Sequence, residues 1–122
     1  MPVELERSPK ATREMKRHRD IVIGFTVRDL SDEDRRTDKI EKHVGGPLVA
    51  EVEPGSIAAV AGLLVSDIIL TVNGTPTPDV RTLKKTMANI HKTRPERIVF
   101  FVKRGVYTAF VETEDPWLAD EE

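Results

Sequence analysis

No cysteine occurs in this sequence, which excludes disulfide bonds and thiolate metal sites. No charge sign dominates either: the formal net charge is -2, so no electrostatic footprint for nucleic acid or an acidic membrane stands out. The longest apolar run, Ile57 to Val65, falls far short of the ~20 residues of a membrane-spanning helix. The charged N-terminus also lacks the apolar core of a signal peptide. We therefore expect no nucleic-acid partner and no direct membrane insertion, and the residues alone assign no compartment.

Signs of catalysis are missing as well. The three histidines, His18, His43 and His91, include no pair at helical ligand spacing, so neither a metal nor a cofactor is expected. Ser56 follows Gly55, but its surroundings are not a nucleophile elbow, and no glycine loop that cradles phosphate occurs. The 122 residues are 39% hydrophobic and 33% charged, which suits one domain with a modest core. We expect a domain that is not itself an enzyme.

The stretch from Gly45 to Gly74 organises the rest of the chain, because it alternates turn residues with short apolar elements. It predicts, in order, a strand at Pro47–Glu53, an N-cap at Ser56, a short buried helix at Ile57–Ala61, a left-handed C-cap at Gly62, a buried strand at Ile68–Val72 and a tight turn at Asn73-Gly74.

This order of elements resembles the centre of a PDZ domain of the bacterial type carried by HtrA-like, trypsin-like serine proteases. The matching residues are Val52–Ser56, Ala58-Ala59, Ala61–Leu63, Asp67–Leu70 and Val72–Gly74. Two positions depart from the usual pattern. Val65-Ser66 stands where Pro-Gly commonly precedes the aspartate, which leaves the shape of that turn open, and Ile57 replaces a common proline.

The resemblance implies an α+β fold, a small, partly open β-barrel of about five strands with two helices. The strand order would be the circularly permuted bacterial one, with the groove strand first and a hairpin last. We expect the domain at residues 20–114, a linker and the end of a preceding domain at 1–19, and an acidic tail at 115–122 in which Trp117-Leu118 docks on the body. The chain would then be the last domain of a longer protein, after a protease domain.

The flanking sequence completes this plan. Ile21–Arg28 predicts the first strand, Ser31 caps a short helix through Arg36, Val80–His91 has the period of an amphipathic helix, and Arg97–Arg104 with Tyr107–Thr113 predict the closing hairpin. The basic segment Lys10–Arg19 indicates a short exposed helix in a solvated linker, or else a nucleic-acid or lipid patch.

The resemblance also places a binding site. Val22, Ile23, Gly24 and Phe25 match the loop whose amides bind a peptide's terminal carboxylate, and the alternative reading of Gly24 is a plain β-bulge. A peptide would then add as a strand beside Phe25, Thr26 and Val27. The helical wall of the groove would carry Val80, Leu83, Lys84 and Met87, of which each apolar residue could instead be ordinary core.

The implied function is non-catalytic recognition of C-terminal or extended peptide segments, as the substrate-recognition or regulatory domain of an HtrA-like protease in the cell envelope. Its partners would be unfolded-protein segments and the protease domain of the parent chain. The alternative is a structural or assembly domain whose groove is unused or filled by the chain itself. For the first hypothesis, Gly24→Val is predicted to abolish binding without unfolding the domain.

Overall fold

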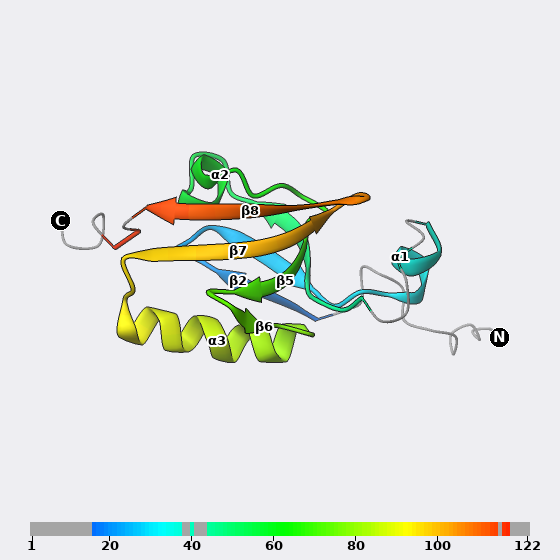
Figure 1. Ribbon diagram of the computed structural model, residues 1–122, viewed down its shortest axis with the longest axis horizontal. Helices are drawn as coiled ribbons and strands as arrows, with labels where there is room; N and C mark the ends of the chain where they lie inside the picture. The colour runs from blue at the N-terminus through cyan, green and yellow to red at the C-terminus, as the bar shows by residue number, and fades with distance from the viewer. Residues whose placement is uncertain (1–15, 38–39, 41–43, 115, 118–122) are drawn as a thin grey trace.

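The computed structural model describes residues 16–37, 40, 44–114 and 116–117 (Figure 1). Within that part of the chain, all strands join one antiparallel sheet of seven strands, in the order β2-β3-β4-β5-β7-β8 with β6 paired to β5. The strands are β2 (Arg17–Asp20), β3 (Phe25–Arg28), β4 (Leu48–Val52), β5 (Ile68–Val72), β6 (Thr75–Pro76), β7 (Arg97–Arg104) and β8 (Tyr107–Glu114).

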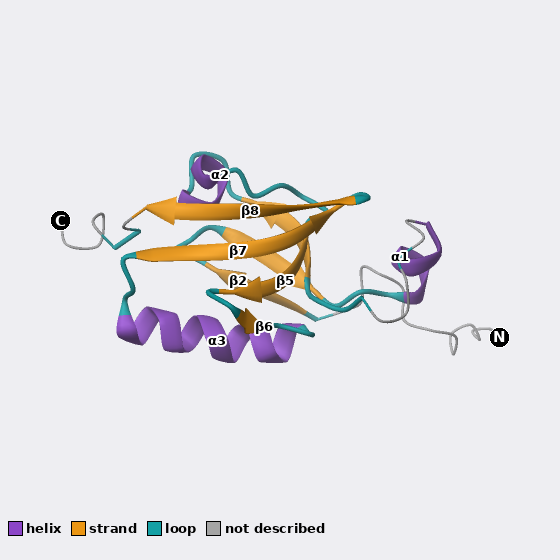
Figure 2. Cartoon of the chain, viewed as in Figure 1, coloured by secondary structure: helices purple, strands orange, loops and turns teal. Residues whose placement is uncertain are grey.

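Three helices accompany the sheet in the described residues: α1 (Asp32–Thr37), α2 (Ile57–Ala61) and α3 (Val80–Thr93). Figure 2 shows α3 along one side of the strands, α2 beside β8, and α1 apart from the sheet at one end. The fold class is the predicted one. The sheet is open, and the count exceeds the expected five strands and two helices because β2, β6 and α1 add to it.

The two ends of α2 form as the sequence predicts. Ser56 has extended backbone, and its hydroxyl accepts a hydrogen bond from the amide of Ala59 at 3.1 Å. Gly62 is left-handed, with φ 100, and its amide donates to the carbonyls of Ala58 and Ala59. These caps satisfy backbone groups that a helix of only five residues leaves free at both ends.

Helix α3 supplies one wall of the core. Asp79 caps its N-terminus by accepting from the amide of Thr82 at 2.8 Å. The helix buries Leu83, Met87 and Ile90, which recur at three- and four-residue spacing. They pack with the inward residues of the sheet, including Phe25 and Phe100, whose rings meet edge to face at 5.6 Å.

The turn before β5, left open by the sequence, is stabilised by a buried aspartate. Asp67 is 1% exposed, and its carboxylate accepts from the amide of Leu64 at 2.9 Å. Arg104, at the end of β7, donates to the same carboxylate through Nε and Nη2 at 2.8 and 2.7 Å.

Ser66, in the same turn, has a φ of 80, so it occupies the left-handed conformation that the glycine of Pro-Gly would adopt without strain. The turn therefore forms with a serine, rather than a glycine, in the left-handed position.

Candidate functional site

The predicted first strand is divided in two by a tight turn. Residues 21–24 form the turn between β2 and β3, so the strand expected from Ile21 begins only at Phe25. Gly24 has a φ of 93, and its amide donates to the carbonyl of Asp20 at 2.7 Å. The turn is held from outside by two main-chain bonds at 2.8 Å, from Glu53 to Gly24 and from Ala58 to Ile23. The loop is thus fixed against the end of β4 and the first turn of α2.

The amides of this turn converge on a carboxylate of the same chain. Oδ1 of Asp20 accepts from the amides of Val22 at 3.1 Å and Ile23 at 2.9 Å. Its Oδ2 lies 2.8 Å from Nε2 of His91 on α3. The Asp20 side chain is 2% exposed, so this carboxyl group is removed from water and held by amides and an imidazole. The turn therefore has the donor arrangement of an anion-binding nest.

Strand β2 covers the edge of β3 that the sequence assigned to a peptide. The two strands are antiparallel, with Arg17 opposite Arg28 and Asp20 opposite Phe25. The expectation for the basic segment is wrong here. Residues 17–19 were placed in a linker with a short exposed helix, and they form part of the sheet. The tight turn at 21–24 directs the preceding residues back along β3, whose free backbone groups they pair. Residues 10–15 lie outside the described part.

The predicted site residues separate onto two sides of the β2–β3 hairpin. Val22, Lys84 and Met87 line an open cavity of about 340 Å³ between β2 and α3. Gly24, Phe25 and Thr26 line another cavity, of about 310 Å³, that also borders Glu51 of β4 and Glu53 just after that strand.

The apolar residues expected at the groove belong largely to the core. Ile23, Val27 and Leu83 are 0% exposed, and Phe25 and Met87 are 1% exposed. Val80 is half-buried against the same cluster, whereas Lys84 is exposed.

Sequence reasoning missed Asp20 and His91 as site residues. The sequence did contain a signal for Asp20, which lies two residues before Val22 and three before Ile23. At this spacing an aspartate side chain often accepts hydrogen bonds from the backbone amides that follow it. His91 also contacts the tail: its ring meets that of Trp117 at 5.4 Å, and Trp117 Nε1 donates to the Pro95 carbonyl at 2.6 Å. Trp117 is buried as predicted, and Leu118 lies outside the described residues.

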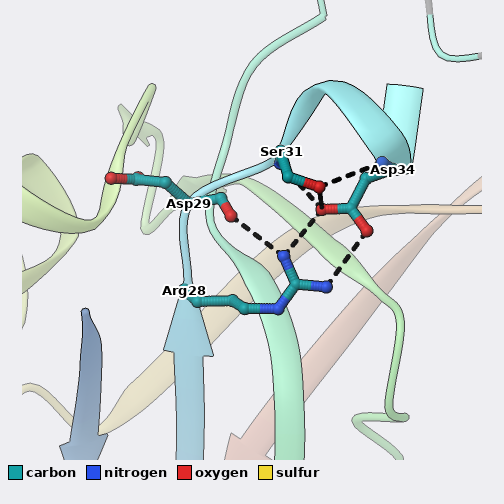
Figure 3. Close-up of polar contacts among 4 residues, drawn as sticks. All are labelled: Arg28, Asp29, Ser31 and Asp34. Carbon is teal, nitrogen blue, oxygen red and sulfur yellow. Dashed lines mark hydrogen bonds and ion pairs between the residues drawn. The ribbon is translucent and has the colours of Figure 1, made fainter. Parts of the chain in front are cut away.

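A second polar cluster lies at the opposite end of β3 (Figure 3). Arg28 donates to both carboxylate oxygens of Asp34, at 2.6 and 3.0 Å, and Asp34 accepts from the amide and hydroxyl of Ser31. Ser31 in turn accepts from the amide of Asp34, which confirms it as the cap of α1. Asp29 accepts from the amide of Val80 at 2.8 Å, so this cluster joins β3 to the start of α3.

This cluster predicts a loss of stability in acid. The hydrogen bond from Arg28 lowers the pKa of Asp34 from 3.8 to about 2. A carboxylate whose pKa is lowered by folding adds stability above its unfolded pKa, and that stability is lost as the pH falls from about 4 towards about 2. We expect a contribution of at most about 2 kcal/mol. Urea unfolding at pH 6 and pH 3 should show a smaller pH difference in Asp34→Asn than in the wild type. An equal difference in both would remove Asp34 as the cause.

The structure indicates that Gly24 also supports the fold, so we now expect Gly24→Val to destabilise the domain, in contrast to the sequence-based prediction of an intact domain. A Cβ at residue 24 would lie 2.2 Å from Cβ and 2.6 Å from Oγ of Ser56, on a backbone with φ +93. We expect Gly24→Ala to lower the free energy of unfolding by at least about 2 kcal/mol. Adding Ser56→Gly, which removes both contact atoms, should recover part of this loss in urea unfolding. No recovery would assign the whole cost to backbone strain.

In the described residues, no group of three or more histidine, aspartate or glutamate side chains could hold a metal ion. No helix in that part of the chain is long and apolar enough to cross a membrane.

Comparison with known proteins agrees with this architecture. The model of the PDZ domain family matches residues 12–96. A curated relative, a probable periplasmic serine endoprotease DegP-like of Chlamydia pneumoniae, is 28% identical over 91% of this chain. The chain spans 22% of that relative's length.

Two solved structures of HtrA proteins are also similar. The HtrA3 PDZ domain bound to a phage-derived ligand (FGRWV) is 27% identical, with a TM-score of 0.59 over 83% of this chain and 86% of that chain. The HtrA-type protease AlgW with a decapeptide is 27% identical, with a TM-score of 0.63 over 82% of this chain and 29% of that one. With its antiparallel sheet, its short capped helix and its turn of inward amides, this chain belongs to the PDZ domain family, with homology to the PDZ domains of HtrA-type proteases.

Proposed function

We propose that this domain binds extended peptide segments with a free C-terminus, by strand addition beside β3. The observation that carries the proposal is the turn at residues 21–24, whose amides already hold a buried carboxylate next to that strand. Main-chain pairing along β3 would supply affinity, and side-chain pockets would supply preference. The peptide-bound HtrA3 and AlgW structures, similar in fold and sequence, support this reading.

The parent protein, on this proposal, is an HtrA-like serine protease, and the domain recognises substrates or regulates the protease. The match to a protease named as periplasmic supports a parent in the cell envelope. As a PDZ domain, the chain itself is a non-catalytic module. The sequence-based division, with a linker at 1–19, the domain at 20–114 and the tail at 115–122, is part of the proposal with one change. Because β2 begins at Arg17, we propose that the linker ends before that residue.

A second candidate function is a structural or assembly role with a self-occupied groove. The pairing of β2 with β3 favours it, because the strand edge that a ligand needs is taken by the chain itself. Sedimentation of this chain and of the full-length parent would test it, since an assembly domain should drive association.

The experiment for the first function measures binding of fluorescent peptides with free C-termini, with C-terminally amidated copies as controls. Peptide interfaces of this size are expected to bind at about micromolar Kd, roughly -8 kcal/mol. Binding that disappears on amidation supports the carboxylate site. Binding that is indifferent to amidation contradicts it, and its complete absence in a folded domain favours the assembly role.

A further inference from the structure

Strand β2 and its last residue imitate a bound peptide. An added peptide would lie antiparallel beside β3 with its terminal carboxylate at the amides of residues 22–24. In this chain β2 lies antiparallel on that edge, and the Asp20 carboxylate occupies the amides of Val22 and Ile23. Both parts of the site are therefore filled by residues 17–20.

The strand is held in a way that permits release. Its residues include no hydrophobic side chain: Arg17 and Arg19 are exposed, His18 is half-buried, and only Asp20 is buried. The two arginines reach Glu51 of β4 and Glu53, the residue after β4, at 3.4 and 3.3 Å, in ion pairs whose side chains are all between 39% and 68% exposed. Exposed pairs of this kind contribute little. The strand is thus retained by its ladder with β3 and by the contacts of Asp20.

We propose that β2 is an internal pseudo-ligand, which an incoming peptide must displace to reach β3 and the amides of the 21–24 turn. The inference rests on the proposed function and adds a way in which peptide binding is regulated, namely by the departure of β2. The apparent affinity for peptides is reduced by the small fraction of molecules in which β2 has left. Any change that frees β2 raises peptide affinity without altering the site.

The same geometry specifies the ligand. Alternate residues of a strand face the same side of a sheet, which is why Arg17 and Arg19 meet two glutamates, Glu51 of β4 and Glu53 just after it. A peptide that takes the register of β2 with its last residue at Asp20 presents its penultimate and fourth-from-last side chains to Glu53 and Glu51. The preferred ligand is therefore a C-terminal segment with Lys or Arg at those two positions.

A reversible staple tests the displacement. Arg19 and Thr26 are register partners across β2 and β3, and the chain has no cysteine of its own. In Arg19→Cys/Thr26→Cys, oxidation should lock β2 in place and reduction should free it. The probe is a fluorescent decapeptide with Arg at the two preferred positions and a free C-terminus. We expect binding at least about tenfold weaker in the oxidised than in the reduced form. Each single cysteine variant should be insensitive to redox state.

A second variant tests the carboxylate. Asp20→Ala removes the internal competitor for the turn amides and should bind the same peptide about tenfold or more tightly than the wild type. Circular dichroism checks that it is folded. An affinity equal to or weaker than that of the wild type, in folded protein, would assign Asp20 a merely structural place in the turn and overturn the proposal.

The remaining outcomes separate this inference from the function on which it rests. Equal binding by oxidised and reduced protein overturns the displacement of β2 but leaves peptide binding intact. No binding by the reduced double variant and by folded Asp20→Ala overturns the proposed function itself. The double variant Glu51→Lys/Glu53→Lys tests the ligand class. It should change the preferred side chains at the penultimate and fourth-from-last peptide positions from basic to acidic. An unchanged preference would overturn the predicted ligand class.

Discussion

Replacing Arg104 with alanine is expected to lower the free energy of unfolding by about 3–5 kcal/mol. The substitution removes both hydrogen bonds from Arg104 to the Asp67 carboxylate, which is 1% exposed and keeps the bond from the amide of Leu64. The hydrogen bond to Asp67 raises the pKa of Arg104 above its ordinary value, so the guanidinium is charged in neutral solution. Urea unfolding at neutral pH measures the effect. Asp67→Ala should lower the free energy of unfolding by less than Arg104→Ala does. The Arg104 side chain is 37% exposed, so after loss of Asp67 its guanidinium can be hydrated.

The same strand offers a matched control. Arg97, also on β7, forms an ion pair with Glu112 at 2.7 Å, the same separation as in the Arg104–Asp67 pair. The side chains of Arg97 and Glu112 are 62% and 42% exposed, so Arg97→Ala should cost no more than about 1 kcal/mol. Similar losses in the two arginine variants would show that burial of Asp67 is not the source of the effect.

Leu83→Ala is expected to lower the free energy of unfolding by about 3–5 kcal/mol, because Leu83 is 0% exposed in the core. The sequence allowed Leu83 to line either the groove or the core, and the structure places it in the core beside Met87. Loss of peptide binding in this variant would therefore follow from loss of folded protein. Chemical unfolding, with peptide binding measured on the folded fraction, distinguishes the two effects.

Lys84 is the control for Leu83, since it is the next residue of α3 and is exposed beside the cavity between β2 and α3. Lys84→Ala should leave stability within about 0.5 kcal/mol of the wild type. A Leu83→Ala variant of near wild-type stability that had lost peptide binding would place Leu83 in the binding pocket after all.

The occupied edge of β3 relates the two functions considered above. If β2 leaves under the competition of a peptide, the domain is a recognition module with an internal control. If β2 never leaves, the same strand makes the domain a closed spacer. The stapled variant separates these cases because it fixes β2 without removing a side chain of the turn.

Much of the fold followed from local sequence signals. Ser56 and Gly62 bound α2, and Asp79 begins α3, because caps depend on side chains and backbone within a few residues. The apolar run at Ile68–Val72 gave the bounds of β5 without error. Helix α3 continues to Thr93, two residues beyond the predicted end, until Arg94 adopts a left-handed conformation.

The sequence by itself determined the family and the order of β4, α2, β5, α3 and the closing hairpin, since the signals for these elements lie in neighbouring residues. Only the tertiary structure decided what occupies the site. Strand β2 is charged and has no apolar alternation, so nothing in its own residues predicts a strand. Its conformation comes from the free backbone groups of β3 and from His91, which lies 71 residues beyond Asp20, with a small contribution from Glu51 and Glu53. Contacts over such distances depend on how the chain folds back, and no local pattern specifies them.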